Sequence, residues 1–504
     1  MTENFNRIWH QRADDLLKRG IDGRMVIDGR RWAATDGSLF DCISPVDGKV
    51  IARVARGKAA DIDRAVASAR AAFNDRRWAG QPPAARKKVM VAFAEQLRAA
   101  RDELALLETL DMGKPIKNSL STDVPSAARC LQWFGEAVDK IYDEIAPTGD
   151  NALALITRQA IGVVGAIVPW NYPMLMASWK LGPALAAGNS VVLKPSEKSP
   201  LTALRLAELA LEAGLPEGVF NVVPGFGHEA GEALALHMDV DAIGFTGSTR
   251  TGRRMLDYAS RSNLKRVYNE LGGKSANIVF ADFDDLDRAA ATAIGSMFYN
   301  QGESCNAPSR LLVQDSIADA FVEKLAALTP QYHPADPLDA STVLGALVDE
   351  TQTQTVLGYI QSGVDEGARC VVGGCRALQE TGGQYVAPTV FDGVKNSMKI
   401  AQEEIFGPVL SVIRFKTEAE AVAIANDSAY GLHAGVWSRH IDRAVRVSRA
   451  LQAGTVHVNQ YDEDDITVPF GGVKQSGNGR DKSLHAFDKY TELKTTWMRI
   501  DSAN

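Results

Sequence analysis

Apolar and polar residues alternate with a helical period in the early part of the chain. Ile62, Val66 and Ala69 recur at helical spacing, and Asp61 is placed to cap that helix. A longer helical pattern covers residues 83–110. We therefore expect the early part of the chain to be helical.

From residue 161 onward, short apolar runs alternate with amphipathic helices, as at 201–213 and 250–261. This alternation predicts a parallel sheet with helices on its faces. Ligands bind at the carboxyl ends of the strands in such sheets. The predicted strands cover residues 162–168, 190–193, 219–223 and 241–245.

A second α/β pattern starts with a strand at 276–280 and continues to about residue 470. The tail over 490–500 alternates enough to form another strand. A chain of 504 residues is also too long for one hydrophobic core. The fold class predicted is α/β, with two α/β domains and excursions that belong to neither.

Composition narrows the functional classes. The net charge of -7 gives no electrostatic reason to expect nucleic acid or an anionic membrane as a partner. The longest apolar stretch, 161–170, is too short to span a bilayer, and the N-terminus lacks the apolar core of a signal peptide. Scattered thiols without zinc-ligand spacing predict a reducing, cytoplasmic location and no metal site. These cysteines are Cys42, Cys130, Cys305, Cys370 and Cys375.

Two segments are candidates for phosphate binding. Gly225 and Gly227 follow a predicted strand, but Gly231 falls one place late for a Rossmann fingerprint, so a plain turn remains an alternative. The segment 245–252 (FTGSTRTG) places small residues and hydroxyls between a strand and a helix. Backbone N–H groups at a helix N-terminus favour phosphate there, although an ordinary capped helix is the other interpretation.

Cys305 is the candidate nucleophile, because polar and glycine-bearing neighbours surround it in the segment 300–307 (NQGESCNA). Most lone cysteines are small buried hydrophobes, which is the alternative. Glu270 lies 35 residues upstream, before two glycines at the end of a strand-like run. A thiol and a carboxylate would supply the nucleophile and the base for water that acyl-enzyme chemistry needs.

Taken together, these motifs resemble the aldehyde dehydrogenase superfamily from about Trp9 to Ile500. The stretches 180–201 and 475–496 look most like bacterial dehydrogenases for γ-glutamyl-γ-aminobutyraldehyde and 4-guanidinobutyraldehyde. The matching motifs include the phosphate segment 245–252 and the cysteine segment 300–307. The others are 168–173 (VPWNYP), 194–197 (KPSE), 270–274 (ELGGK), 403–408 (EEIFGP) and 469–472 (PFGG).

The resemblance implies a mechanism in which the Cys305 thiolate attacks the aldehyde. The side-chain amide of Asn171 and the backbone N–H of Cys305 would hold the oxyanion of the thiohemiacetal. Hydride transfer to nicotinamide would leave a thioester, and Glu270 would activate the water that hydrolyses it. Glu303 stands where many members have glutamine, and we expect no loss of activity from it.

The resemblance also implies an NAD site. Lys194 and Glu197 would bind the adenosine ribose hydroxyls, and a carboxylate there would repel a 2′-phosphate, so NAD is expected over NADP. Arg250 lies close enough to keep NADP possible, although it fits a solvated basic helix face. The implied cofactor residues are Ile167, Val168, Pro169, Trp170, Lys194, Glu197, Gly227, Gly231, Phe245, Gly247, Ser248, Thr251, Leu271, Glu404 and Phe406.

For the substrate, four consecutive acids at 462–465 would lie in the loop that covers the tunnel mouth in this family. They would attract cationic aldehydes, and Asp123 would add to them from the opposite wall; a solvated loop is the alternative. The preferred substrate is an ω-amino, guanidino or γ-glutamylamino aldehyde of polyamine or arginine breakdown. The implied tunnel residues are Asp123, Tyr172, Met176, Trp179, Tyr299, Ser304, Asn306, Asp462 and Phe470.

The family likeness predicts three parts. A Rossmann-like NAD domain would comprise 1–138 and 160–270, a catalytic domain 271–470, and a β oligomerisation arm 139–159 and 484–504. The arm implies a homodimer or homotetramer. Other functions remain open: a broad aliphatic or betaine aldehyde dehydrogenase, a coenzyme A-acylating enzyme, a cysteine hydrolase, or a retired enzyme kept as a binding protein.

Overall fold

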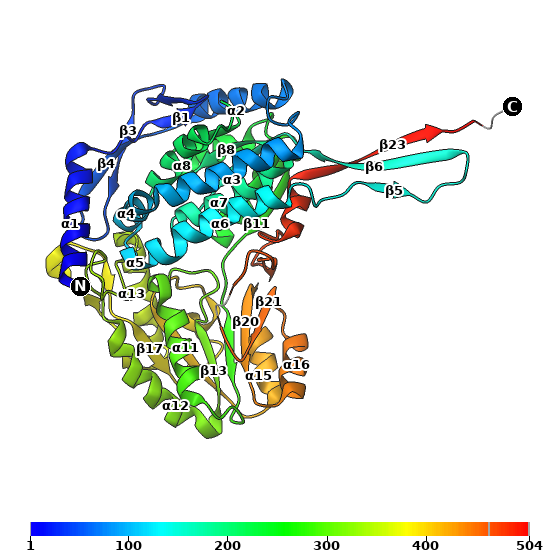
Figure 1. Cartoon of the computed structure of the whole chain (residues 1–504). Coiled ribbons are helices and arrows are strands. Elements are labelled where there is room, and N and C mark those ends of the chain that lie inside the picture. Colours follow the sequence, from blue (N-terminus) through cyan, green and yellow to red (C-terminus); the bar gives the residue numbers. More distant parts are fainter. Residues whose placement is uncertain (1, 462–463, 502–504) are drawn as a thin grey trace.

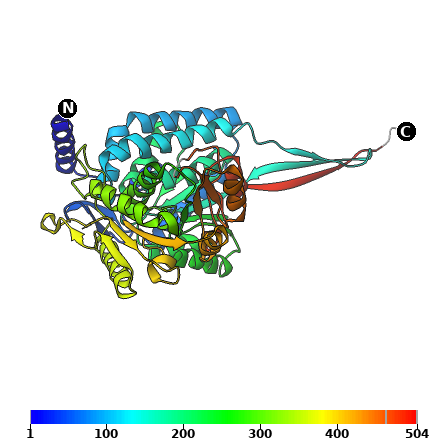
Figure 2. The same cartoon turned by 90° about the horizontal axis from the view of Figure 1, so that it is seen from below.

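The computed structural model describes residues 2–461 and 464–501. Two seven-stranded sheets form the two halves of the body, and a narrow β arm projects from one side (Figure 1). Helix α1 (Thr2–Arg19) lies at the opposite end from the arm (Figure 2). No helix in the described ranges is both long and apolar enough to cross a membrane.

The first sheet has the order β11-β10-β7-β8-β9-β1-β2. Its strands β7 to β11 are parallel, which confirms the strands predicted from the short apolar runs. Helices α7 (Pro173–Ala187), α8 (Leu201–Glu212), α9 (Glu232–Leu236) and α10 (Thr249–Ser260) connect them. The parallel strands are β7 (Val163–Ile167), β8 (Ser190–Lys194), β9 (Phe220–Val222), β10 (Ala242–Thr246) and β11 (Arg266–Glu270).

The early part is not only helical, contrary to the prediction. Strands β1 (Met25–Ile27) and β2 (Arg30–Trp32) extend the first sheet in antiparallel fashion, and β3 (Leu39–Ile43) pairs with β4 (Val50–Ala55). Runs this short carry too few alternations to show a period of two.

The early helices also differ in detail from the sequence pattern. The predicted helix over 83–110 is two helices, α3 (Pro83–Ala99) and α4 (Arg101–Met112), separated at Ala100. Asp61 lies inside α2 (Ala59–Asn74), where its carboxylate accepts a hydrogen bond from the backbone N–H of Lys58 at 3.0 Å. It therefore caps the N–H of Lys58 from the third helical position, which is one half of a capping box, instead of occupying the first capping position. The short α5 (Ile116–Asn118), the π-helical turn η1 (Ser119–Asp123) and α6 (Val124–Ala137) follow.

The second sheet has the order β14-β17-β18-β13-β12-β20-β21 and is parallel except for the edge strand β14. Its boundary with the first sheet falls between β11 and β12. The strands are β12 (Ala276–Val279), β13 (Arg310–Gln314), β14 (Arg369–Val372), β17 (Thr389–Asp392), β18 (Val409–Phe415), β20 (His433–Trp437) and β21 (Thr455–Val458). The helices are α11 (Leu286–Phe298), α12 (Asp315–Leu328), α13 (Glu350–Asp365), α14 (Lys399–Gln402), α15 (Glu418–Asn426) and α16 (Ile441–Ala450).

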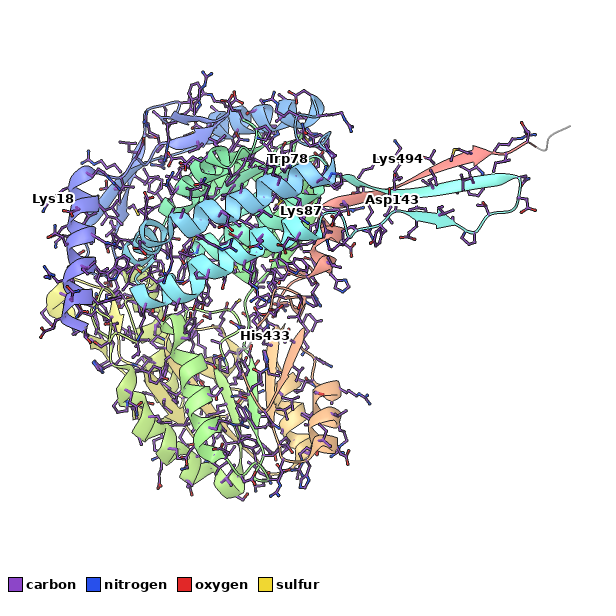
Figure 3. The ribbon with its side chains drawn as sticks, in the orientation of Figure 1. Lys18, Trp78, Lys87, Asp143, His433 and Lys494 are labelled. Atoms are coloured by element: carbon purple, nitrogen blue, oxygen red, sulfur yellow. The ribbon has the colours of Figure 1, made fainter. Side chains whose placement is uncertain are left out.

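The arm is a three-stranded antiparallel sheet of β5 (Glu144–Ala146), β6 (Ala152–Ala160) and β23 (Thr491–Arg499). The register runs from Thr491 opposite Ala160 to Arg499 opposite Ala152, which confirms the predicted pairing of the tail with the segment before residue 160. Figure 3 shows Asp143 and Lys494 on this arm, whereas His433 lies between the two halves of the body.

Candidate active site

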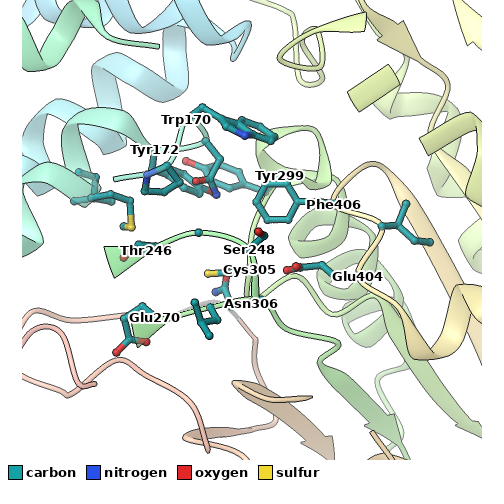
Figure 4. Close-up of a pocket in the computed structure, with 18 of the residues that line it drawn as sticks. Trp170, Tyr172, Thr246, Ser248, Glu270, Tyr299, Cys305, Asn306, Glu404 and Phe406 are labelled. Atoms are coloured by element: carbon teal, nitrogen blue, oxygen red, sulfur yellow. The ribbon is translucent and has the colours of Figure 1, made fainter. Parts of the chain in front are cut away.

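A cavity of about 810 Å³ lies where the carboxyl ends of β7, β10 and β11 face the loops of the second half. This is the edge at which parallel sheets bind ligands. The cavity brings Asn171, Glu270 and Cys305 together, although they are far apart in the sequence. Figure 4 shows Glu270 and Cys305 within it. The other predicted residues that line it are Pro169, Trp170, Tyr172, Met176, Trp179, Gly247, Ser248, Leu271, Tyr299, Asn306, Glu404, Phe406 and Phe470.

The loop that carries Cys305 begins with a left-handed turn. Asn300, Gln301 and Gly302 have φ of 50°, 60° and 72°, a region that non-glycine residues rarely adopt. A Cβ on Gly302 would lie 2.4 Å from the backbone oxygen of Gly407, so only glycine fits there. Such a strained turn persists only where its surroundings hold it.

Side-chain amides supply that support. Asn171 Nδ2 donates to the backbone oxygen of Glu303 at 2.8 Å, and Asn300 Nδ2 donates to the same oxygen at 3.1 Å. Asn171 follows β7, so these bonds tie the nucleophile loop to the first sheet. The amide predicted to hold the oxyanion thus lies against the loop that carries the predicted nucleophile.

The Cys305 thiol is poorly ionised in the resting cavity. Burial raises its pKa, and the carboxylates of Glu404 and Glu270 raise it further. Hydrogen bonds from the backbone N–H groups of Cys305 and Asn306 act in the opposite direction. A thiol in this setting needs help to become a nucleophile, because the thiolate is the reactive form.

Glu270 ends β11 with only 3% of its surface exposed. Neither carboxylate oxygen has a hydrogen-bond partner within residues 2–461 and 464–501. Burial raises the pKa of Glu270 well above its ordinary value, Asp481 adds to the rise, and Lys180 opposes it. A buried carboxylate with unused acceptor sites and a raised pKa has the properties of a general base for water. In Figure 4 its carboxylate points away from the Cys305 thiol.

The cofactor side of the cavity centres on Glu404. Its Oε1 accepts a hydrogen bond from the backbone N–H of Gly273 at 3.0 Å, and burial raises its pKa to about 7. A Cβ on Gly272 would lie 2.1 Å from the other carboxylate oxygen, so glycine is required for this approach. Phe406, with φ of 58°, packs edge-on against the Trp170 ring at 5.2 Å.

Polar groups that suit a dinucleotide lie at two strand ends. Lys194 Nζ is 3.0 Å from Glu197 Oε2 just after β8, and Ser248 Oγ accepts from Thr251 N at 3.3 Å at the start of α10. The N-terminus of a helix following a strand favours phosphate. These residues, with Glu404, fit a nicotinamide dinucleotide.

Part of the predicted cofactor set does not line the cavity. Phe245, only 3% exposed, packs in the core, and Gly227 and Gly231 bound the π-helical turn η2 (Gly227–Gly231). Their roles stay predictions. The remaining members outside the lining are Ile167, Val168, Lys194, Glu197 and Thr251.

On the substrate side, the place of Asp123 in the tunnel wall stays a prediction. This residue is fully buried and pairs with Lys114 at 2.9 Å, away from the cavity lining. Ser304 does not line the cavity either, but its hydroxyl lies 2.7 Å from the Tyr172 hydroxyl.

The structure describes only part of the acidic run at 462–465 that was predicted to attract cationic aldehydes. Asp462 lies outside the described residues. Asp464 lines the cavity and forms an ion pair with Lys482, and Asp465 forms an ion pair with Arg129. The two described acids of the run are therefore neutralised by neighbouring cations.

The cavity also contains residues that the sequence prediction missed. Gln352 comes from α13, where no motif marks it, and its amide donates to the backbone oxygen of Phe406 at 2.7 Å. Arg250 lines the cavity, although its sequence fitted a solvated helix face. The others are Thr122, Leu175, Thr246, Gly272, Gly295, Ser296, Thr355, Tyr359 and Ile405.

A cysteine, a buried carboxylate and polar groups that suit a dinucleotide, all gathered between two α/β halves, indicate a class of enzyme, and comparison with known proteins agrees. The aldehyde dehydrogenase family model matches residues 32–496. The chain belongs to the aldehyde dehydrogenase family and is an NAD(P)-dependent oxidoreductase.

Three relatives illustrate the likeness. The NADP/NAD-dependent aldehyde dehydrogenase PuuC of Escherichia coli is 52% identical over 99% of this chain and 100% of its own. The structure of the P. syringae indole-3-acetaldehyde dehydrogenase AldA, in complex with NAD+ and IAA, has a TM-score of 0.97 at 59% identity, covering 98% of this chain and 99% of its own. The γ-glutamyl-γ-aminobutyraldehyde dehydrogenase from Burkholderia cenocepacia has a TM-score of 0.96 at 58% identity, with the same coverage.

Proposed function

We propose that this enzyme oxidises an aldehyde to a carboxylic acid through a thioester on Cys305. The observation that carries the proposal is the single cavity that holds Cys305, Glu270 and Asn171. Each supplies one need of the reaction: a nucleophile, a base for water and an oxyanion donor.

In this mechanism the Cys305 thiol gives up its proton to solvent and its sulfur attacks the aldehyde carbon. The aldehyde oxygen becomes an oxyanion held by the Asn171 amide and the Cys305 N–H, and a thioester remains once hydride has left this carbon. One such donor is worth about 3–4 kcal/mol of barrier. Bound NAD supplies the hydride acceptor. Glu270 then takes a proton from a water molecule, which attacks the thioester carbonyl and releases the acid and the thiol. The raised pKa of Glu270 makes it a stronger base for that proton than an exposed carboxylate.

For the cofactor, Glu197 would accept from a ribose hydroxyl while Lys194 donates, so NAD is preferred and NADP remains possible. With the carboxylate 3.0 Å from the lysine, a 2′-phosphate held by that lysine would meet a negative charge. The name of the relative PuuC includes both cofactors.

The preferred substrate is an ω-amino, guanidino or γ-glutamylamino aldehyde. The proposal is supported by the likeness to γ-glutamyl-γ-aminobutyraldehyde dehydrogenase. It is also supported by the aminoacetaldehyde dehydrogenase of Pseudomonas aeruginosa, 48% identical over 99% of both chains. The charge of the tunnel mouth supports it less than expected, because Asp464 and Asp465 are paired.

An aromatic aldehyde is a second candidate. The Trp179 and Phe470 rings lie 4.9 Å apart in the cavity wall, and Tyr172 and Tyr299 line it as well. Ring-lined walls bind flat aromatic groups well. The relative named for indole-3-acetaldehyde is 59% identical.

The enzyme is also proposed to act as a homodimer or homotetramer in the cytoplasm. Tyr142, Ile145 and Trp497 are 76%, 70% and 66% exposed on and beside the arm, an apolar surface that a second copy would cover. All five cysteines are free thiols, which suits a reducing compartment.

The test measures NADH formation from aldehydes with amino, guanidino, γ-glutamylamino, neutral aliphatic, aromatic and carboxylate tails. A clear lead in kcat/KM for nitrogen-bearing tails supports the preferred substrate, and a lead for aromatic tails supports the second candidate. In parallel, Cys305→Ala should lose turnover while keeping its circular dichroism spectrum. Turnover in that variant would contradict the mechanism.

A further inference from the structure

Three fully buried charged groups lie behind the substrate side of the cavity. Lys114 Nζ is 2.9 Å from Asp123 Oδ1 and 3.1 Å from Glu108 Oε1, and none of the three side chains is more than 1% exposed. Taking three charges out of water is costly, so a cluster of this kind calls for an explanation beyond surface solubility.

The lysine also contacts the active site. Its ammonium lies 4.2 Å from the centroid of the Tyr172 ring, the residue that follows Asn171 and lines the cavity. A cation over the face of an aromatic ring is attracted by the ring electrons, and the attraction is strongest where water is excluded. Glu108 and Asp123 pair with the same ammonium, so the cation beside the ring is itself held by two contacts.

The hydroxyl of Tyr172 connects its ring to the loop that carries Cys305. This hydroxyl lies 2.7 Å from Ser304 Oγ, and Ser304 immediately precedes Cys305. The loop begins with the left-handed residues Asn300 and Gln301. Because this conformation is strained, the loop depends on contacts with neighbouring residues to keep its shape.

We propose that Lys114 is a positioning residue for the reaction: its ammonium fixes the ring of Tyr172, whose hydroxyl holds Ser304 and thereby Cys305. Lys114 does not touch the substrate; it acts through Tyr172. Glu108 and Asp123 serve to keep the ammonium in place and charged. The inference rests on the proposed role of Cys305 as nucleophile.

The alternative is that Lys114 only balances buried carboxylates. Tyr172→Phe tests the last contact in the proposed chain, because it keeps the ring under the ammonium and removes only the hydroxyl. Positioning predicts that kcat/KM for the aldehyde, per titrated active thiol, falls about tenfold, the effect of losing one well-placed hydrogen bond. The dissociation constant for NAD should change by less than about twofold, because the loop and not the cofactor cleft is disturbed.

Variants of the cluster test the lysine itself. Lys114→Met combined with Asp123→Asn removes one cation and one anion together, which limits the cost of unpaired buried charge. It should also lose about tenfold in kcat/KM, whereas Lys114→Arg, which keeps a cation over the ring, should stay within about threefold of wild type. Glu108→Gln is the milder comparison, because the ammonium and its closer partner Asp123 both remain, and it should stay within about threefold of wild type.

Combining Tyr172→Phe with the Lys114→Met/Asp123→Asn pair tests whether Lys114 and Tyr172 act on Cys305 through the same contact. If both act through one link, the combined loss stays near tenfold; independent effects would multiply to about a hundredfold and overturn the proposal. If the Lys114→Met/Asp123→Asn protein does not fold, Tyr172→Phe and Lys114→Arg decide alone, and full kcat/KM in Tyr172→Phe overturns it. Turnover by Cys305→Ala would instead contradict the proposed function.

Discussion

The amide nitrogen of Asn171 lies 2.8 Å from the backbone oxygen of Glu303, two residues before Cys305. A side-chain amide carries two N–H groups, so one can hold the loop while the other serves an oxyanion. The hydrogen bond fixes the amide plane before substrate arrives, and donors fixed in advance stabilise a developing charge most effectively.

Asn171→Ala should therefore lower kcat/KM about 10²–10³-fold, the usual effect of losing one oxyanion donor. The measurement is NADH formation per titrated thiol. Asn300→Gly is the matched control, because it also loses a hydrogen bond to the Glu303 oxygen, while glycine accepts the left-handed φ at that position. Equal losses in both variants would show that Asn171 acts only through loop structure.

Glu303→Gln tests whether the buried acid is uncharged. Glu303 is fully buried, its Oε1 accepts from Val348 N at 3.1 Å, and burial raises its pKa well above the ordinary value of 4.5. A neutral carboxyl and an amide are nearly isosteric, so activity should stay within about twofold and the amide oxygen should keep the Val348 bond.

The pH dependence of stability follows from the same shift. Between the unfolded pKa and the raised folded pKa the folded state binds the extra proton, so the free energy of unfolding of the wild type falls as pH rises, by about 1.4 kcal/mol per unit. In Glu303→Gln this contribution is absent, so the free energy of unfolding does not fall with pH for this reason. Urea titrations at pH 5 and pH 8 should show a stability advantage of the variant that grows with pH, and parallel curves would mean that Glu303 is ionised when folded.

Glu197→Gln should shift cofactor preference toward NADP. Removing the carboxylate 3.0 Å from Lys194 removes repulsion of a 2′-phosphate and leaves the lysine to attract it. The ratio of kcat/KM for NADP to that for NAD should rise about tenfold, a modest share of the repulsion between two charges at close range. Lys194→Met serves as the control and should weaken both cofactors; an unchanged ratio in Glu197→Gln would assign cofactor choice to other residues.

The sequence predicted the buried strands well because their pattern is local. Every residue of β7, β8 and β10 is buried, so each strand is a continuous apolar run that can be recognised without knowing its neighbours. Strand β1 was missed, since it is only Met25–Ile27 and joins the sheet through a partner, β9, far along the chain.

Residues that depend on long-range pairing were beyond the sequence. Asp123 was predicted as a tunnel acid, and no motif shows that it pairs with Lys114, which also pairs with Glu108. Asp464 looked like a free charge until the fold brought Lys482 to it. That Asn171, Glu270 and Cys305 line one cavity could be predicted only because each lies in a motif of its own.

Lys482→Met tests whether that ion pair sets substrate choice. The Lys482 ammonium lies 5.5 Å from the centroid of Trp179 and 5.9 Å from that of Phe470, and it pairs with Asp464 in the cavity wall. Methionine keeps the apolar stem but leaves the carboxylate unbalanced. The ratio of kcat/KM for an amino aldehyde to that for a neutral aldehyde of equal length should rise about tenfold, because an uncompensated charge attracts a cationic tail.

Arg129→Met is the matched control for that experiment. It releases Asp465 from its ion pair in the same way, but Asp465 does not line the cavity, so the ratio should change by less than about twofold at physiological salt. A rise only in Lys482→Met would mean that the wild-type lysine restrains the selection of cationic tails at this wall. If neither variant shifts the ratio, charge beside Trp179 and Phe470 has no part in selection, and the shape of the ring-lined cavity must discriminate between aldehydes.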